Sequence, residues 1–190
     1  MEGARLAAHD LACRRGDRVL FAGLSFALTP GEALQVSGAN GTGKSSLLRI
    51  LAGLLRPFAG AVESSGPIAL LDGNLPLDEH LPLSEALAFW GRIDGTLSGR
   101  DAGLAAIDDV PVRFLSTGQR KRAAVLQSNP RRGGIWLLDE PLNGLDTQAA
   151  RSLEARIADH CADGGIAVIA SHQPFALPGL RTIALAEFAP

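Results

Sequence analysis

A glycine-rich run from residue 38 to residue 45 is the first part of this chain whose residue types and spacing predict chemistry. It reads Gly-Ala-Asn-Gly-Thr-Gly-Lys-Ser, which matches the P-loop pattern of a glycine-rich turn followed by Lys and Ser. Glycines allow the backbone N–H groups of such a turn to point inward at phosphate oxygens. We expect Lys44 to reach the β- and γ-phosphates of a nucleotide and Ser45 to ligate Mg²⁺. The residues predicted to bind the nucleotide here are Gly38, Ala39, Asn40, Gly41, Thr42, Gly43, Lys44, Ser45 and Ser46.

The scarcity of lysine supports this role for Lys44. Lysine and arginine together number 18, and only Lys44 and Lys121 are lysine. A chain so biased toward arginine still has lysine at the position where a compact ammonium must fit beneath phosphates.

Two adjacent carboxylates follow a short apolar run in the second half of the chain. Ile135–Leu138 predicts a buried strand, and Asp139 and Glu140 come directly after it. Ligands of open α/β sheets bind at the carboxyl ends of the strands. We expect Asp139 to hold Mg²⁺ through water. Glu140 can polarise an attacking water as general base, a role usually worth ~10²–10⁴-fold in rate.

A histidine follows a second apolar run in the same way. Ile166–Ala170 predicts another buried strand, which would bring His172 to the same edge of the sheet as Asp139. His172 can then hydrogen-bond a γ-phosphate. The predicted catalytic residues are therefore Glu140, His172 and Lys44.

The pentapeptide Leu115-Ser116-Thr117-Gly118-Gln119, hereafter the signature, lies ahead of these carboxylates. Ser116 and Gly118 open a predicted helix. We expect the N-terminal amides of this helix to lack partners in their own fold, and such a helix end can bind an anion. The chain thus carries a second phosphate-binding device.

The elements that must position these residues alternate between strands and helices, which predicts parallel βαβ units. Strands are expected as short pieces within Arg5–Leu28, with a turn at Gly16-Asp17, and then at Glu32–Ser37, Ala61–Glu63, Ile68–Leu71, Ile135–Leu138, Ile166–Ala170 and, as an edge strand, Thr182–Leu185. Helices are expected at Lys44–Leu54, through Leu87 and Trp90 with Ser84 as N-cap, and at Gly103–Ile107, Ser116–Ser128 and Thr147–Cys161, the last capped by Asp146.

This order predicts a single α/β domain over residues 1–190. Its P-loop NTPase core, a mostly parallel sheet with flanking helices, would cover about 1–73 and 130–190. An antiparallel β portion would begin the core, and a small helical insertion would cover about 74–129.

The composition excludes several classes of protein. A net charge of −2 and a pI of about 6.1 give no electrostatic footprint for nucleic acid. The longest apolar runs fall far short of the roughly 20 residues that a membrane helix needs, and no secretory leader is evident. Cys13 and Cys161 show no metal or redox spacing, so we expect buried, small apolar residues in a reducing compartment.

These motifs in this order resemble the nucleotide-binding subunits of ABC transporters, over nearly the whole chain. The resemblance implies an ATPase that uses ATP and Mg²⁺ and forms an ATP-dependent homodimer, with two subunits head to tail around two ATP molecules. Each ATP would contact the P-loop, Asp139, Glu140 and His172 of one subunit. The signature of the other subunit would complete the ATP site with Ser116, Gly118 and Gln119, and the positive end of the helix behind Ser116 would add to phosphate binding.

Within that family the chain resembles the heme-exporter branch of cytochrome c biogenesis. The similar stretches are Gly38–Pro57, Ser84–Trp90, Val110–Gln119, Ile135–Pro141 and His172-Gln173-Pro174. This resemblance implies a peripheral protein on the cytoplasmic face of a bacterial inner membrane. It would bind the integral membrane subunits of a heme-handling complex through its helical insertion and would not bind nucleic acid. The alternatives are an ATPase subunit for another small cargo and a nucleotide-gated ABC protein without a transport role.

The chain departs from the family pattern at three places. Thr117 stands where many members have Gly or Ala. The usual Mg²⁺-contacting Gln is missing from the loop after Ile68–Leu71, where Asn74 is the first candidate metal ligand and Asp72 the second. The chain has no Tyr, and Arg15 falls near the position of the usual aromatic under adenine. A guanidinium could stack on the base there, or it could remain solvated with adenine held loosely.

Two adjacent aromatic residues, Phe89 and Trp90, lie on a predicted helix of the insertion. Core packing explains them, and so does an aromatic anchor in a contact with a membrane subunit.

Overall fold

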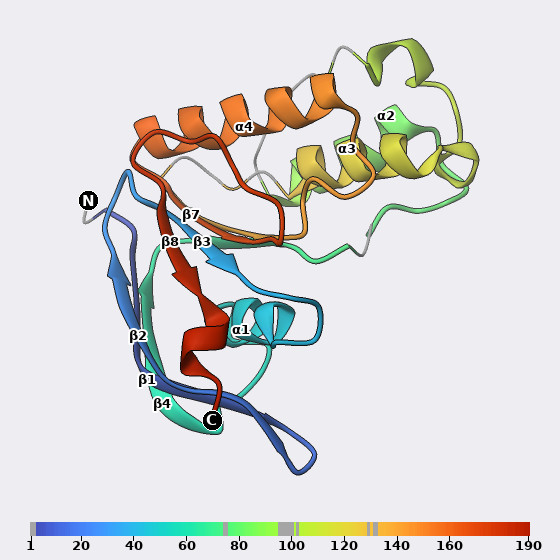
Figure 1. Cartoon of the computed structure of the whole chain (residues 1–190). Coiled ribbons are helices and arrows are strands. Elements are labelled where there is room, and N and C mark those ends of the chain that lie inside the picture. Colours follow the sequence, from blue (N-terminus) through green and yellow to red (C-terminus); the bar gives the residue numbers. More distant parts are fainter. Residues whose placement is uncertain (1–2, 74–75, 95–100, 102, 129, 131–132) are drawn as a thin grey trace.

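A sheet of five parallel strands runs through the middle of the protein, as the computed structural model shows for residues 3–73, 76–94, 101, 103–128, 130 and 133–190 (Figure 1). The strand order is β5-β6-β7-β3-β8. The strands are β3 (Ala33–Ser37), β5 (Ile68–Leu71), β6 (Ile135–Asp139), β7 (Ile166–Ala170) and β8 (Arg181–Ala184). Helix α1 (Lys44–Leu51) lies against one face and α4 (Thr147–Ala162) against the other. The predicted parallel α/β fold is confirmed, and β8 is an edge strand as expected.

The two faces of the sheet follow from side-chain alternation along its central strands. In β6, Ile135 and Leu137 join the core cluster that contains α1. Trp136 and Leu138 point the other way, into the cluster that contains α4. All four side chains are fully buried, which explains why the sequence shows an unbroken apolar run rather than an alternating one.

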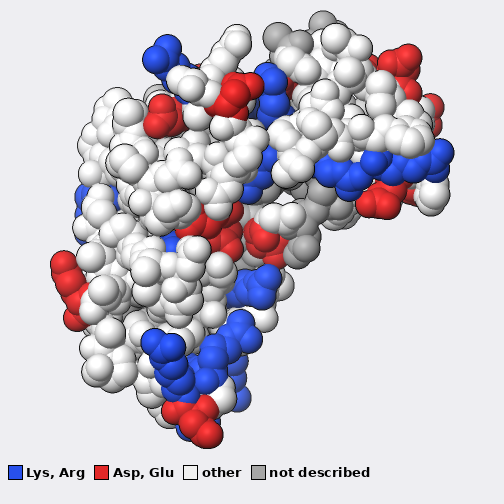
Figure 2. Space-filling view, turned by 45° about the vertical axis from the view of Figure 1, so that its right-hand side comes forward, with Lys and Arg blue, Asp and Glu red and all other residues white. Residues whose placement is uncertain are grey.

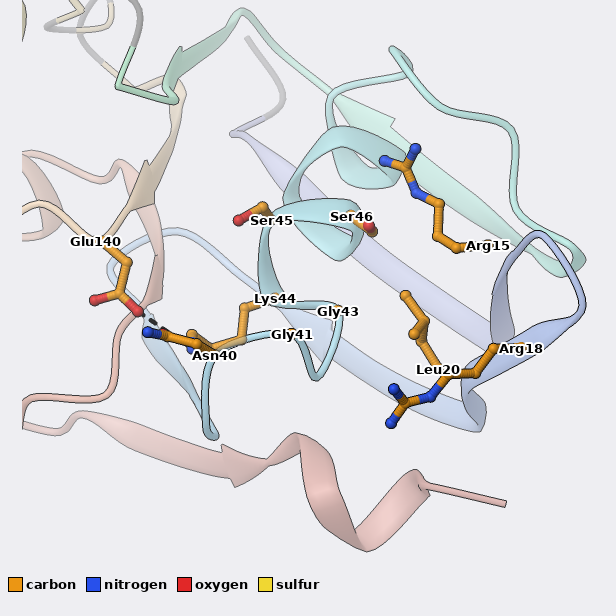
Figure 3. A pocket seen from close by; sticks show the side chains of 10 residues that line it. All are labelled: Arg15, Arg18, Leu20, Asn40, Gly41, Gly43, Lys44, Ser45, Ser46 and Glu140. Atoms are coloured by element: carbon orange, nitrogen blue, oxygen red, sulfur yellow. Dashed lines mark ion pairs between the residues drawn. The ribbon is translucent and has the colours of Figure 1, made fainter.

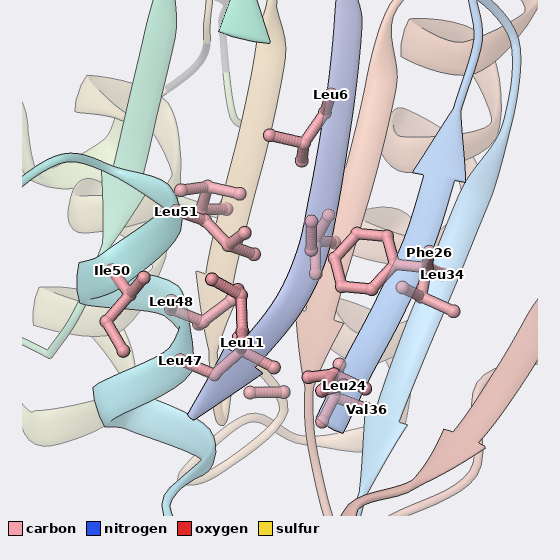
Figure 4. Packing of buried hydrophobic residues seen from close by; sticks show 14 of the residues in the cluster. Leu6, Leu11, Leu24, Phe26, Leu34, Val36, Leu47, Leu48, Ile50 and Leu51 are labelled. Atoms are coloured by element: carbon pink, nitrogen blue, oxygen red, sulfur yellow. The ribbon is translucent and has the colours of Figure 1, made fainter. Parts of the chain in front are cut away.

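A second, antiparallel sheet covers the far side of α1 (Figure 1). Its Leu11 and Leu24 pack in one core cluster with Leu47 of α1 (Figure 4). Its order is β2-β1-β4, with β1 at Arg5–Arg15, β2 at Arg18–Leu28 and β4 at Ala59–Ser65. The hairpin turn at residues 16–17 is confirmed, but the expectation of short strands is wrong. Both strands have 11 residues, and register shifts along β1 interrupt the apolar alternation on which the shorter prediction rested.

The helical part lies beside α4 and contains α2 (Leu83–Asp94) and α3 (Thr117–Gln127), with short 3₁₀ turns at Ala105–Ile107 and Val112–Phe114. It has a core of its own. Ser84 is not the N-cap of α2, because the helix begins at Leu83. The N–H groups of Leu83 and Ser84 donate to the carbonyls of Val110 and Asp108, respectively, each at 3.0 Å. Backbone carbonyls at residues 108 and 110 therefore cap the helix in place of a side chain.

Three further expectations concern the remaining elements. α1 ends at Leu51 rather than Leu54, because Gly53 takes a left-handed conformation with φ 73°. Both cysteines are free thiols; Cys13 is buried and Cys161 half-buried. In the described part of the chain, each helix is too short or too polar to cross a bilayer.

Candidate nucleotide-binding site

The glycine-rich loop joins the carboxyl end of β3 to the start of α1. Gly43 is the residue before the helix, with φ 108°. A Cβ at Gly43 would lie 3.2 Å from atoms of Leu20 and Phe21, so both the conformation and the close approach of β2 require glycine there. The first turn of α1 has no side-chain cap and no acidic residue. The loop therefore presents the positive end of α1 in the way an anion site requires.

Lys44 is held at the centre of this loop. Its side chain is 5% exposed, and Nζ donates to the carbonyls of Gly38 at 2.7 Å and Ala39 at 3.2 Å. The same ammonium lies 3.2 Å from Glu140 Oε1 (Figure 3). Thr42 Oγ1 donates to Ala39 O at 2.9 Å and tightens the turn.

Asp139 and Glu140 lie at the carboxyl end of β6, level with the ends of the neighbouring strands. Asp139 pairs with Ala170 of β7, and Ala170 pairs with Val36 of β3. Burial raises the pKa of Asp139, the Glu140 carboxylate adds to the rise, and a hydrogen bond from Ser45 opposes it. Asp139 Oδ1 is buried and has no hydrogen-bond partner within the described residues.

Glu140 takes an unusual backbone conformation. Its φ is 43°, in the left-handed region that a residue with a Cβ rarely adopts. Its N–H donates to Ala170 O at 2.8 Å, which fixes the turn at the end of the strand. The conformation aims the carboxylate at the glycine-rich loop (Figure 3).

His172 completes a line of three contacting side chains. Its Nδ1 is 2.8 Å from Glu140 Oε2, while Oε1 of the same carboxylate faces Lys44. Burial opposes ionisation of Glu140, but the hydrogen bond with His172 and the contact with Lys44 outweigh it and lower the pKa. Glu140 is therefore ionised at neutral pH, as a general base must be.

A pocket of about 440 Å³ opens beside this loop. In the space-filling view, acidic side chains lie in the middle of the hollowed face and basic ones flank it (Figure 2). The structure thus brings together most residues predicted from the P-loop, with Arg15 and Glu140. The residues lining the pocket are Arg15, Arg18, Leu20, Asn40, Gly41, Gly43, Lys44, Ser45, Ser46 and Glu140.

Arg18 and Leu20 are lining residues that the sequence reasoning missed. The two-residue turn pairs Arg15 with Arg18 across the β1–β2 hairpin, and Arg15, Arg18 and Leu20 all line the pocket from this hairpin (Figure 3). The turn signal could have revealed this pairing. Arg14 is used elsewhere, with its guanidinium carbon 4.5 Å from the centre of the Phe58 ring.

The signature lies at the start of α3, and none of its residues lines the pocket around Lys44. Ser116 is the N-cap: its Oγ accepts from Gln119 N at 3.3 Å, and its N–H donates to Gln119 Oε1 at 2.8 Å. The expectation of unpartnered amides is therefore wrong for Gln119, because the capping box satisfies it. A Cβ at Gly118 would lie 3.1 Å from Gly144 O, so glycine allows the loop after β6 to approach the helix.

The loop after β5 holds the two candidates to replace the missing Mg²⁺-contacting Gln, and the structure describes one of them. Asn74, the first candidate metal ligand, lies outside the described residues. Asp72, the second candidate, forms an ion pair with Arg49, in which Oδ2 lies 3.5 Å from Nη2. Lys121 on α3 also faces this region. Burial lowers the pKa of Lys121, and the charges of Asp139, Glu140 and Asp72 oppose that shift.

Trp90 and Phe89 have different environments. Trp90 packs against the core of the helical part, and its Nε1 donates to Pro76 O at 2.5 Å. Phe89 is 47% exposed and meets the Trp90 ring edge to face at 5.7 Å. Core packing thus accounts for Trp90 but not for Phe89.

Comparisons with known proteins agree with this geometry. A family model described as ABC transporter matches residues 21–143. The Novosphingobium aromaticivorans protein named cytochrome c biogenesis ATP-binding export protein CcmA is 56% identical, with 100% of both chains covered. The protein of the same name from Zymomonas mobilis is 50% identical over 97% of this chain and 86% of its own.

Solved structures share the fold at lower identity. A Pyrococcus furiosus chain solved as an ABC transporter ATP-binding protein superposes with a TM-score of 0.81 at 18% identity, over 98% of this chain and 100% of its own. An ATP-binding subunit of an ABC transporter gives a TM-score of 0.76 at 22% identity, over 88% and 79%.

Proposed function

Because this chain belongs to the ABC transporter family, in the group of cytochrome c biogenesis ATP-binding export proteins, we propose that it binds and hydrolyses ATP for a complex that exports or delivers heme. The observation that carries the proposal is the contact line from Lys44 through Glu140 to His172 at the end of β6. It joins a phosphate-binding lysine, an ionised base and a histidine at one edge of the sheet.

The P-loop holds the phosphates in this proposal. Lys44 exchanges its contact with Glu140 for contacts with phosphate oxygens, and the amides at the start of α1 add their partial positive charge. Glu140, freed from Lys44, accepts a proton from the attacking water. His172 holds the Glu140 carboxylate in place at 2.8 Å and faces the position of the γ-phosphate.

Magnesium fits the donor set at the end of β6. Asp139 Oδ1 is a buried oxygen without a hydrogen-bond partner in the described residues, and Ser45 lies in contact with the same carboxyl. Hydroxyl and carboxylate oxygens are ligands that Mg²⁺ prefers. When bound, the ion neutralises charge on the phosphates. Asn74 remains the proposed ligand from the loop after β5.

The adenine ring of ATP lies at the other end of the pocket, beside Arg15. Arg15 and Arg18 each offer a planar guanidinium group to a purine ring, and Leu20 offers apolar surface. We therefore retain stacking on Arg15 as the proposed replacement for the usual aromatic.

The signature serves the partner subunit's ATP in this proposal. Ser116, Gly118 and Gln119 lie away from the pocket of their own chain, which supports a head-to-tail dimer that adds them from outside. The partners are the integral membrane subunits of a heme-handling complex. The exposed Phe89 on α2, next to the core of the helical part, supports docking there, at the cytoplasmic face of the inner membrane.

A substitution at Glu140 tests the proposal. Wild-type protein should show Mg²⁺-dependent ATP hydrolysis, and Glu140→Gln should lower it by about 10²–10⁴-fold while ATP binding persists. Hydrolysis by the Gln variant at the wild-type rate would refute the assignment of the base. ATP that is bound but not turned over, even with membrane partners, would favour a nucleotide-gated role.

The heme-handling part needs a separate measurement. Co-purification from membranes with identification of the bound proteins should recover multi-helix heme-handling subunits. Recovery of permease subunits for an unrelated cargo would contradict it.

A further inference from the structure

The residue directly after the signature, Arg120, folds back over the start of its own helix. Its Nε donates to Leu115 O at 3.2 Å, and its Nη2 donates to Arg113 O at 2.7 Å. The remaining terminal nitrogen, Nη1, meets Glu79 Oε1 at 3.3 Å. One guanidinium thus ties together two backbone carbonyls and a carboxylate from a segment far away in sequence.

The backbone that Arg120 holds is the extended entry to α3. Leu115 and Ser116 have φ/ψ of −67°/139° and −64°/162°, and Leu115 O is bonded by the Arg120 side chain, whereas Ser116 O accepts from Arg120 N at 2.9 Å. The planar fork of arginine can satisfy several acceptors at once in a fixed geometry, which an ammonium cannot. Arg120 therefore sets the angle at which the chain enters α3 at Ser116.

The other end of this tie is a short backbone ladder. Arg113 N donates to Glu79 O at 3.0 Å, and Val112 N donates to Leu81 O at 3.1 Å. The segment that carries Glu79 follows the loop after β5. Glu79 thus fixes the lead-in to the signature both through its backbone and through the carboxylate that meets Arg120.

The charge of this helix end supports a role in anion binding. The first turn of α3 has no acidic residue. Three consecutive cations follow it, at residues 120–122, of which Arg120 meets Glu79 and Arg122 meets Asp101. Cations near a helix N-terminus oppose the helix dipole and cost stability. Violations of such local rules are expected at functional sites.

We propose that Arg120, held by Glu79, is a positioning residue that orients Ser116 and Gly118 toward the ATP of the partner subunit. The inference rests on the proposed function, because it requires that the signature completes a second subunit's site. Arg120 itself touches the backbone before the signature, and it acts through the direction of the amides at the helix start.

ATP-driven dimerisation of the Glu140→Gln protein, in which hydrolysis is blocked, provides the test. We expect Glu140→Gln with ATP and Mg²⁺ to elute as a dimer in size-exclusion chromatography with light scattering. Adding Arg120→Ala should weaken this dimer by about 10- to 100-fold. The reason is that a displacement of about 1 Å in the groups at the start of α3 is enough to lose a factor of this size. ATP binding by the monomer should stay unchanged, since the pocket around Lys44 is not altered.

Three further variants separate positioning from a general loss of structure. Glu79 is 62% exposed, so Glu79→Ala should fold normally and weaken the dimer in the same direction by a smaller factor. Arg120→Lys should restore the dimer only partly. Arg181 is the matched control, because it likewise joins a backbone carbonyl, Ala27 O, to a carboxylate, Glu32, but lies far from the signature in sequence. Arg181→Ala should leave the dimer intact.

Different results overturn different claims. A parent Glu140→Gln protein that stays monomeric with ATP refutes the shared site of the proposed function, and this inference with it. If the parent dimerises, and the Arg120→Ala and Glu79→Ala variants dimerise as tightly as the parent does, only the inference about Arg120 is refuted. Loss of monomer ATP binding in Arg120→Ala, or equal loss of the dimer in Arg181→Ala, also overturns it.

Discussion

Glu140 and Lys44 hold each other in this structure, and this predicts that removing the catalytic carboxylate strengthens nucleotide binding. The two charges are 3.2 Å apart, with Lys44 5% and Glu140 21% exposed. If Lys44 binds phosphate, this contact must be given up in the complex. Glu140→Gln removes the competitor for the ammonium and also removes a negative charge that faces the phosphates.

The size of the effect follows from the strength of the contact that is lost. The contact is an ion pair between two largely buried groups, and we take about 1.5–3 kcal/mol for it, the contribution of a contact with a charged group. Since about 1.4 kcal/mol corresponds to a tenfold change in affinity, Glu140→Gln should bind ATP about 10- to 100-fold more tightly.

The assay is a titration with ATP in EDTA, so that any role of Asp139 in holding metal does not contribute. Isothermal calorimetry gives the dissociation constants of wild type and variant directly. Glu85→Gln, an exposed carboxylate on α2, is the control for loss of charge and should not change the affinity. Unchanged or weaker binding by Glu140→Gln would refute the idea that Glu140 competes for Lys44.

Three other predictions follow from burial and close contacts. Asp139→Asn should raise the free energy of unfolding by about 1 kcal/mol while lowering Mg²⁺-dependent hydrolysis, because it removes a buried charge with an unpartnered oxygen; a lower Tm in thermal unfolding would contradict this. Burial lowers the pKa of His160 in the folded protein below its ordinary value of 6.5. As the pH falls, His160 is therefore protonated in the unfolded chain before it is protonated in the folded protein, and the free energy of unfolding should decrease from pH 6.5 toward the depressed pKa. Urea unfolding at several pH values should show this loss, and His160→Gln should reduce it. Gly118→Ala places a Cβ 3.1 Å from Gly144 O and should lower kcat about tenfold, as small misplacements do, with ATP affinity unchanged; equal kcat values would show that the loop yields freely.

The parts of the site that could be predicted are those carried by local sequence. The P-loop and the acids at the end of β6 follow from motifs within a few residues, and parallel strands bring their ends to one edge whatever the rest of the chain does. The edge strand β8 and the Asp146 cap, whose Oδ1 accepts from Ala149 N at 2.8 Å, follow in the same way.

The parts that could not be predicted depend on contacts between distant segments. The tie from Arg120 to Glu79 spans 41 residues, and nothing at either position indicates the other. Ser84 has the residue type of an N-cap, but backbone from residues 108 and 110 satisfies that helix end. The length of β1 was missed because register shifts break the alternation that predicts strands.

The left-handed backbone at Glu140 has a consequence for how this protein responds to selection. A side chain with a Cβ at φ 43° costs about 1–2 kcal/mol relative to an unstrained conformation, and glycine relieves most of that cost. The same substitution removes the contacts of the carboxylate with Lys44 and His172, and the first of these alone contributes about 1.5–3 kcal/mol. Laboratory evolution for heat resistance alone should therefore keep glutamate at position 140. Selection for robustness then preserves the carboxylate on which hydrolysis depends, even in rounds that do not measure turnover.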